Sequence, residues 1–546
     1  MTIESDQSTR ATSPARWPLD FPPTWSGCPR KPLLSVLLDG FQARPNHVPL
    51  YFDDHFSITN AELQAGIEQF AGYLRQFVGA GDRVILAMGN RVEFVIASLA
   101  VLANRGVVIP VSPEMASHEA EFLAQDSESR IAIADPTSAP TLTALIGTPS
   151  PLERVIQIEG DEPHGFAGVA AGSDPLRLQD VEGDIHDMMD IGYTSGTTGL
   201  PKAIGGSHLE TLRYLDVALR VRYRDADENT RILYPLQFHY GDPLTALYSA
   251  IYGGYSVIVM RKFSASRFWQ VAKDLRATAI LTIGSIPDML LSRPEGPSDR
   301  DHAVRSAIAL AIPPSRHAEL ERRFGFPWRE TYGSSESGPA IAMPEDLGAN
   351  YVGTGALGIP YPDVQARLVD EEGQELLGAA SGELELAGQI CFEGYVNNPE
   401  ANAEILHDGW LRSGDIMCRD EDGMYYFLGR RKEIIRRSGI NIAPAEVEAV
   451  LRLHADVVDA AVVPVPDEMM GEEVKAYVEL MPGATFDPAA LADFTADKLS
   501  RHKIPRYIEL RVEPFPRTPT QRIPKSELKV DGAHRTDSAW DRSAAL

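Results

Sequence analysis

The amino-acid sequence predicts an α/β protein with a large N-terminal domain of βαβ subdomains, a small β-rich subdomain, and a small α+β C-terminal domain. Strand-like apolar segments alternate with amphipathic helical segments as far as about Tyr351. Short segments with glycine turns follow, and a compact alternation of helix and strand patterns begins after Gly429. Strands that alternate with helices are typical of βαβ units and a parallel sheet.

The N-terminal elements are read in order from this alternation. The strand DRVILAMGN precedes the helix RVEFVIASLAVLANRG, which ends at Gly106. VVIPVSP and RIAIAD are the next strands, with the helix ASHEAEFLAQDSES between them. The same rhythm returns in HLETLRYLDVAL, ILYPL, YSVIVM, RFWQVAKDLRA and AILTI.

The C-terminal elements have a different texture. DVQARLVDEEGQEL and GELELAGQI predict the β-rich subdomain. The helix APAEVEAVLRLH, the strands DAAVVPVP and EEVKAYVEL, and the helix DPAALADFTADKLS predict the last domain. In VKAYVEL, apolar Val474, Ala476 and Val478 alternate with Lys475 and Tyr477, as in a strand with one buried face.

Composition limits the function classes. A chain of 546 residues is too long for one compact core, so two or more domains are expected. A net charge of −26 argues against nucleic acid as a general partner. The three widely spaced cysteines favour a reducing cytoplasm, and the sequence has no apolar run that predicts membrane insertion.

The stretch YTSGTTGLPK predicts a loop that holds phosphates. Its glycines allow close backbone approach, and its hydroxyls, backbone N–H groups and lysine suit a phosphate chain, although the spacing is not that of the Walker loop. The alternative is a mobile glycine-rich linker. The residues expected to bind are Thr194, Ser195, Gly196, Thr197, Thr198, Gly199 and Lys202.

Five ordered motifs carry a family resemblance. After YTSGTTGLPK come YGSSES, GWLRSGD, GRRKEIIRRSGINIAPAEVE and FPRTPTQRIPKSEL. Together they resemble the adenylate-forming superfamily, which includes the acyl-CoA synthetases. The closest likeness is to AMP-dependent CoA ligases of the carnitine/crotonobetaine type, through QFHYGDP, RFWQVAKDLRATAI and CFEGYVNNPEA.

The resemblance implies roles for residues around the nucleotide. Glu336 would hold Mg²⁺, because this cation takes few protein oxygens together with substrate phosphates. Asp415 would accept the ribose hydroxyls of ATP, and Arg430 would contact ribose and phosphate. Tyr332, Gly333 and Ser335 would complete the nucleotide site. A solvated glutamate and a turn aspartate are the structural alternatives.

The resemblance also implies domain boundaries and a mobile C-terminal domain. The large adenylation domain would cover residues 16–431 and the small lid domain residues 432–530. Lys432 would be the hinge, and Ser438 and Gly439 would approach coenzyme A. Residues 1–15 and 531–546 are expected to be disordered.

The substrate pocket is expected beside His239, which would also have a catalytic role. Gln237, Tyr240, Leu310 and Ile312 would line this pocket. Leu310 and Ile312 are bulkier than the small residues that many relatives have there. The polar residues of QFHYGDP, which include Asp242, favour a small or polar acid over a long fatty chain.

One departure from the family concerns the final loop. Arg522 stands in TPTQRIPK where the family has a lysine that bridges the substrate carboxylate and the α-phosphate. Arg522 keeps the charge on a larger, planar donor. Lys525, three residues further on, would substitute only if the loop were rearranged.

These motifs predict an enzyme that activates a carboxylic acid with MgATP and transfers the acyl group to coenzyme A. An alternative is an adenylating enzyme with another acid or acceptor, such as an amine, a carrier-protein arm, or nitrite in a diazotase-type reaction. A second alternative is a non-catalytic binder of nucleotide or acyl groups.

Overall fold

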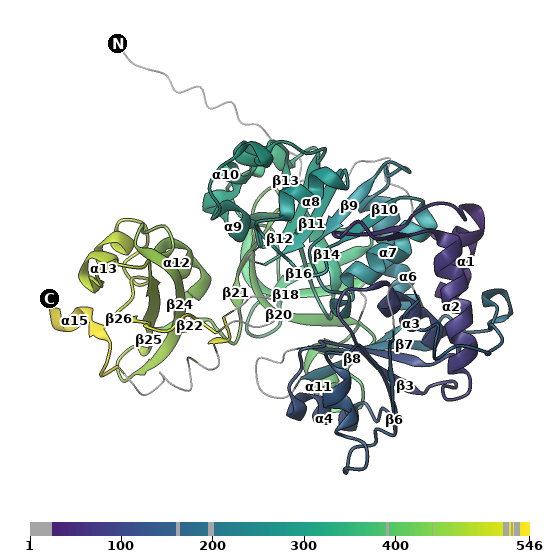
Figure 1. Ribbon diagram of the computed structural model, residues 1–546. Helices are drawn as coiled ribbons and strands as arrows, with labels where there is room; N and C mark the ends of the chain where they lie inside the picture. Colours follow the sequence, from purple (N-terminus) through teal and green to yellow (C-terminus); the bar gives the residue numbers. More distant parts are fainter. Residues whose placement is uncertain are drawn as a thin grey trace.

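The computed structural model describes residues 25–159, 164–194, 201–284, 286–388, 392–438, 440–516, 523–525, 528 and 536–545. Figure 1 shows a large N-terminal body and a smaller C-terminal domain beside it, joined next to β21 (Tyr425–Arg430). No helix in the described ranges is long and apolar enough to cross a membrane.

The first sheet of the large domain contains the predicted βαβ units. Its strand order is β6-β5-β3-β4-β7-β8, with parallel pairing from β6 through β7 and an antiparallel hairpin between β7 and β8. The strands are β3 (Arg83–Ala87), β4 (Val107–Val111), β5 (Ile131–Ala134), β6 (Arg154–Gln157), β7 (Met188–Thr194) and β8 (Lys202–Ser207). The crossover helices are α3 (Val92–Ala103) and α4 (Ser117–Asp126), and α5 (Ala139–Thr143) connects β5 to β6.

The second sheet is larger and mixed. Its parallel part contains β1 (Leu50–Phe52), β9 (Arg231–Tyr234), β10 (Ser256–Val259), β11 (Ala279–Ile283), β12 (Ser306–Leu310) and β13 (Trp328–Ser334). The helices between these strands are α7 (Asp242–Gly253), α8 (Phe268–Asp274), α9 (Ile286–Leu291) and α10 (Pro314–Phe324). Near the N-terminal end of the described chain, α1 (Leu33–Ala43), α2 (Asn60–Leu74) and β2 (Ser57–Ile58) pack on the large domain, whose core includes α6 (His208–Val217).

The antiparallel end of this sheet is the predicted β-rich subdomain. It contains β14 (Gly338–Ala342), β15 (Ala356–Pro360), β16 (Val364–Val369), β17 (Glu375–Leu376), β18 (Ala380–Gly388), β19 (Leu406–His407), β20 (Trp410–Arg419) and β21, with α11 (Pro399–Ile405). Leu368, Leu384 and Met417 are fully buried from three of its strands. Burial of about 1.5–3 kcal/mol per large apolar side chain stabilises this layer.

The C-terminal domain has its own sheet and its own apolar core. It contains β22 (Ile435–Arg437), β23 (Ile440–Ile442), β24 (Val457–Asp467), β25 (Gly471–Leu480), β26 (Tyr507–Leu510) and β27 (Trp540–Asp541). The helices α12 (Pro444–Leu451) and α13 (Pro488–Ala496) pack on its core, and α15 (Arg542–Ala545) lies near the C-terminus. Val474, Ala476 and Val478 are completely buried, but Lys475 and Tyr477 are buried as well. Both faces of β25 are therefore covered, and the expectation of a single buried face is wrong.

The structure corrects the expectation of a disordered tail over residues 531–546 for residues 536–545, and the rest of this range lies outside the described residues. Trp540 and Asp541 in this stretch pair with Ile508 and Tyr507 of β26, so the chain returns to the sheet edge as β27. Arg506 supports this return, because its Nε lies 3.3 Å from Oδ1 of Asp541. A short polar segment far from the preceding strands lacks the periodicity that predicts such an edge strand.

Candidate functional site

The phosphate-loop motif spans the turn of the β7–β8 hairpin. Thr194 ends β7 and pairs with Lys202, the first residue of β8. The hydroxyl of Thr194 donates to the carbonyl oxygen of Lys202 across 3.4 Å. The other loop positions predicted to bind, Ser195, Gly196, Thr197, Thr198 and Gly199, lie outside the described residues.

Tyr395 brings Lys202 and Glu336 together. Residues 394–396 run beside β8, because Val396 donates its N–H to the carbonyl of Ala203 across 2.8 Å. The hydroxyl of Tyr395 donates to Oε1 of Glu336 across 2.9 Å. The Lys202 ammonium lies 4.8 Å from the centroid of the same ring. An acid and a cation are therefore held by one side chain next to the phosphate-loop hairpin.

Glu336 lies in the turn between β13 and β14. The buried hydroxyl of Ser337 accepts the N–H of Ser334 across 3.0 Å and closes this turn. A Cβ at Gly333 would lie 2.3 Å from the carbonyl oxygen of Gly338, so packing of the hairpin alone requires glycine there. Ser335 is exposed and Glu336 is half-buried.

The candidate magnesium ligand fits the chemistry of that cation. In the described part of the chain, no group of three His, Cys, Asp or Glu side chains is placed to hold a metal ion. Mg²⁺ bound with substrate phosphates needs only one or two protein carboxylates, with water filling the rest. A single half-buried glutamate beside the phosphate-loop hairpin meets that requirement.

Asp415 is fixed between a phenol and a guanidinium. It lies on β20 opposite Arg430 on β21 and is 1% exposed. Tyr332 donates its hydroxyl to Oδ2 of Asp415 across 2.6 Å, and Nε of Arg430 lies 2.8 Å from Oδ1. Burial and the Asp415 carboxylate raise the pKa of Tyr332 well above its usual value, so this tyrosine remains a donor.

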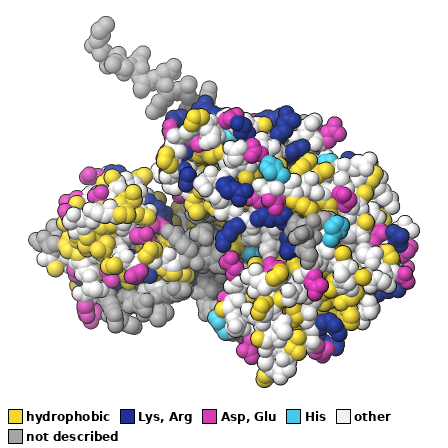
Figure 2. All heavy atoms as spheres, viewed as in Figure 1, with side chains coloured by type: hydrophobic (Ala, Val, Ile, Leu, Met, Phe, Trp, Pro, Cys, Tyr) yellow, Lys and Arg dark blue, Asp and Glu magenta, His cyan; other side chains and the backbone are white. Residues whose placement is uncertain are grey.

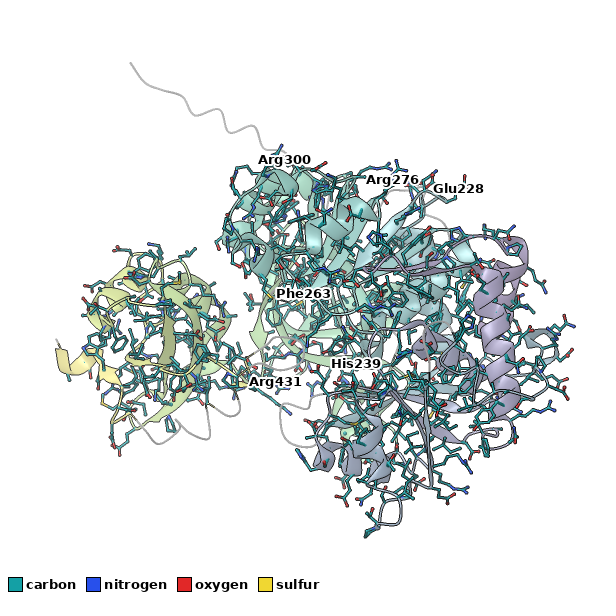
Figure 3. The ribbon with its side chains drawn as sticks, viewed as in Figure 1. Glu228, His239, Phe263, Arg276, Arg300 and Arg431 are labelled. Atoms are coloured by element: carbon teal, nitrogen blue, oxygen red, sulfur yellow. The ribbon has the colours of Figure 1, made fainter. Side chains whose placement is uncertain are left out.

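The expected hinge and the coenzyme A stretch lie where the chain leaves the large domain. Exposed Lys432 lies in the turn between β21 and β22, next to Arg431, which Figure 3 labels between the two domains. Ser438 has a φ of 49° in the β22–β23 hairpin, a conformation that two-residue hairpin turns require. Gly439 lies outside the described residues.

His239 lies half-buried at the predicted acyl pocket, near the middle of the large domain (Figure 3). Its ring centroid is 4.3 Å from that of Tyr240. Burial lowers the pKa of His239 to about 4, against a smaller opposing effect of Glu114. The ring is therefore neutral near pH 7.

Other predicted pocket residues have different surroundings. Gln237 donates its side-chain amide to the carbonyl of Arg261 across 3.1 Å, which fixes its orientation. Leu310 is half-buried at the end of β12. Ile312 is only 4% exposed and packs in a core cluster with Trp328, so in this structure its side chain is part of the core.

Two buried polar residues outside the predicted set hold the pocket loops. Asn90 donates to the carbonyls of Leu236 and Met260 and accepts the N–H of Phe238, all within 2.8 Å. Glu330 accepts the N–H groups of Ala311 and Ile312 at 3.2 and 2.5 Å, respectively.

Glu330 also supports an unusual backbone conformation. Ala311 has a φ of 66°, the left-handed region that non-glycine residues rarely adopt. Burial raises the pKa of Glu330 to about 8, although its two N–H partners oppose this shift. Glu330 comes two residues before YGSSES and Tyr395 lies within CFEGYVNNPEA, so the motifs could have marked both, whereas nothing in the sequence marked Asn90.

The final loop is only partly described. Arg522 lies outside the described residues. Nζ of Lys525 lies 2.7 Å from Oε1 of Glu448 and 3.3 Å from Oε2 of Glu433. Burial alone would lower the pKa of Lys525, but the two carboxylates outweigh it and raise the pKa. Lys525 is thus a buried ion-pair partner within the C-terminal domain.

Comparison with known proteins covers most of the chain. Residues 39–396 match the AMP-binding enzyme family, and residues 446–522 match the AMP-binding enzyme C-terminal domain. The first match contains YTSGTTGLPK and YGSSES, the second contains parts of the last two motifs, and GWLRSGD lies between the two matches. The matches confirm the superfamily indicated by the sequence.

Individual relatives agree with this assignment. The chain is 36% identical over 343 residues to a sulfoacetate–CoA ligase of Cupriavidus necator. This alignment covers 62% of this chain and 65% of the relative. It is 27% identical over 465 residues to a crotonobetaine/carnitine–CoA ligase of Salmonella paratyphi A, with 82% and 88% covered. ATP-bound MatB from Rhodopseudomonas palustris superposes with a TM-score of 0.82 at 26% identity, with 92% and 99% covered.

The predicted fold class is confirmed by these neighbours, which share the arrangement of a large and a small domain. The matched ranges, the ordered motifs and the solved relatives lead to one assignment. The chain belongs to the AMP-binding enzyme family and is an AMP-forming ligase of the acyl-CoA synthetase type.

Proposed function

We propose that this enzyme activates a small or polar carboxylic acid with MgATP and transfers the acyl group to coenzyme A. The observation that carries the proposal is the contact of Tyr395 with both Glu336 and Lys202 beside the phosphate-loop hairpin. One cation and one candidate metal ligand on the same ring, beside the hairpin that resembles a phosphate loop, support a site for the phosphates of ATP. The sulfoacetate–CoA ligase, whose named substrate is a short polar acid, supports the substrate size.

In the first half-reaction, a carboxylate oxygen of the acid attacks the α-phosphorus of ATP, and the bond to pyrophosphate breaks. Lys202 would stabilise the departing pyrophosphate, and Mg²⁺ at Glu336 would supply further positive charge to the phosphates. Asp415, oriented by Tyr332 and Arg430, would hold the ribose. Positioning and electrostatic stabilisation account for catalysis of this kind, without a covalent intermediate on the protein.

In the second half-reaction, the thiol sulfur of coenzyme A attacks the acyl carbonyl, AMP leaves, and the thiol proton passes to solvent. We propose that rotation at Lys432 then brings the Ser438 hairpin toward the coenzyme. Exposed Lys432 in a short turn between two sheets fits such a gating step.

The final-loop cation would act in the first half-reaction. Lys525 is held by Glu448 and Glu433, which supports Arg522 as the group that reaches the substrate carboxylate and the α-phosphate. A guanidinium with several fixed donors suits a charge that develops between two oxygens.

Pyrophosphate release with and without coenzyme A tests the proposal. The enzyme, MgATP and a panel of short polar, aromatic and long-chain acids would be assayed, with product masses determined. We expect acid-dependent release that is fastest with short polar acids, together with a thioester when coenzyme A is present. Pyrophosphate and AMP without any thioester across the panel would refute coenzyme A as the acceptor.

A further inference from the structure

A half-buried arginine lies beyond the end of α6. The helix continues from Val217 into one π-helical turn, Ala218–Arg222, in which the N–H of Tyr223 donates to the carbonyl of Ala218 across 2.8 Å. Such turns are rare in proteins, and many of those that occur lie at functional sites. Arg220, on the same turn, is buried and pairs with Asp216 and Asp363. Arg222 faces different partners.

The hydrogen-bond partners of Arg222 are tyrosine hydroxyls. Its Nε donates to Tyr361 across 3.1 Å, and its Nη1 donates to Tyr214 across 3.4 Å. These bonds use two of the five N–H donors of a guanidinium. Within the described ranges, no carboxylate pairs with Arg222. A desolvated cation without an anionic partner is costly, so this arrangement favours an anion that arrives from outside.

Asp242 connects this group to the acyl pocket. It is the first residue of α7 and directly follows the loop of Gln237, His239 and Tyr240. The hydroxyl of Tyr214 donates to its carboxylate. Tyr214, Arg222 and Asp242 are each half-buried, whereas Tyr234 nearby is 1% exposed. The three side chains therefore keep part of their surface outside the packed core.

We propose that Arg222, through the N–H donors that Tyr361 and Tyr214 do not use, binds a second anionic group on the acid substrate, a carboxylate or a sulfonate at the end away from the reacting carboxylate. The proposal rests on the proposed function and narrows its substrate class to short acids with two negative charges. Arg222 is then a specificity residue that does not contact the reacting atoms.

The same residues argue against a cationic substrate group. The Asp242 carboxylate already accepts the Tyr214 hydroxyl, and it lies at the N-terminus of the twelve-residue helix α7, where the helix dipole stabilises its negative charge. Asp242 therefore has less need of an external cation. Burial and Asp242 raise the pKa of Tyr214 well above its usual value, so the phenol stays protonated and continues to donate to Asp242.

Paired acids of equal length test the inference. Rates of pyrophosphate release at limiting acid would give kcat/KM for malonate and propanoate, and for succinate, butanoate and 4-aminobutanoate. The wild-type enzyme should favour the dianionic member of a pair by about 100-fold, because removal of one partner from a buried charge pair is expensive. A preference for the acid that has only the reacting carboxylate, or for 4-aminobutanoate, would overturn the inference.

Variants separate recognition from folding. Arg222→Gln should reduce the preference for the dianion to about one and leave the rate with propanoate or butanoate unchanged, and Arg222→Lys should keep part of the preference. Arg224→Gln removes an exposed arginine on the same segment and is the matched control. If Arg222→Gln lowers the rate equally for acids with and without a second anionic group, Arg222 has a structural role and the inference is overturned.

Tyr361→Phe provides a second test should Arg222→Gln fail to fold. It removes only the hydroxyl that holds Nε of Arg222 and should reduce the preference for dianions more than the rate with butanoate. An unchanged preference would contradict the assigned subsite. If none of the acids supports pyrophosphate release by the wild-type enzyme, the proposed function fails and this inference fails with it. If only acids without a second anionic group are activated, the inference is refuted but the proposed function stands.

Discussion

Tyr395 donates a hydrogen bond to Glu336 across 2.9 Å, while the face of its ring contacts the ammonium of Lys202. Burial and the Glu336 carboxylate raise the pKa of Tyr395 above its ordinary value, so the phenol remains a donor throughout the neutral range. Figure 2 shows Lys and Arg side chains gathered near the middle of the large domain on the face in view.

Glu336→Gln should raise the Mg²⁺ concentration needed for half-maximal pyrophosphate release. The amide keeps the shape of the side chain but loses the charge that a hard cation prefers. Tyr395→Phe is the matched variant, because it leaves the Glu336 charge in place and removes only one hydrogen bond, which should lower the rate by about tenfold. A magnesium titration that matches the wild type would remove Glu336 from the metal site.

Lys202→Met should lower the rate of pyrophosphate release by about 100-fold, since it removes one preorganised charge from the site. The melting temperature should change little, because the ammonium is half-buried and faces a single ring. Stopped-flow detection of pyrophosphate, alongside thermal melting, measures both quantities. Normal turnover would show that the β7–β8 hairpin does not hold the phosphates.

Lys525→Met should destabilise the C-terminal domain by about 3 kcal/mol, because it leaves the buried Glu448 and the half-buried Glu433 without their cation. Lys525 therefore has a structural role that the final-loop motif did not predict. Thermal melting of Lys525→Met and of the double variant with Glu448→Gln measures the effect, and the double variant should recover part of the loss. A melting temperature of Lys525→Met equal to that of the wild type would show that Lys525 does not form these ion pairs.

Arg522→Ala should lower adenylation by about 10²–10³-fold and spare thioester formation from supplied acyl-adenylate. The reason is that its charge would act only as the carboxylate approaches the α-phosphate. Separate assays of the two half-reactions serve as the internal control. Equal loss in both would show that Arg522 has another role.

His239→Gln should reduce the sensitivity of the melting temperature to acid. Because burial lowers the pKa of His239 from 6.5 to about 4, its neutral ring contributes stability that is present above pH 6.5 and is lost as the pH falls toward 4. The melting advantage of the wild type over the variant should therefore narrow between pH 7 and pH 5. A constant difference would show that the ring does not titrate as its burial requires.

The sequence predicted the features that depend on local pattern. Alternating strands and helices gave the βαβ units, and ordered motifs located Asp415 and Glu336. The features it missed depend on pairing across long separations: Asn90 contacts Leu236 and Met260. The π-helical turn that orients Arg222 was also missed, because it changes the register of a helix without any glycine or proline to mark the position.

The central claim is that an acyl-adenylate links the acid to coenzyme A, and oxygen labelling tests it most directly. The enzyme would be given an acid whose two carboxylate oxygens are ¹⁸O, with MgATP and coenzyme A, and the masses of the products would be measured. The account predicts one ¹⁸O in AMP for each thioester formed, because the oxygen that attacks the α-phosphorus leaves with AMP. ADP in place of AMP, with ¹⁸O in inorganic phosphate, would show activation through an acyl phosphate and would contradict the account.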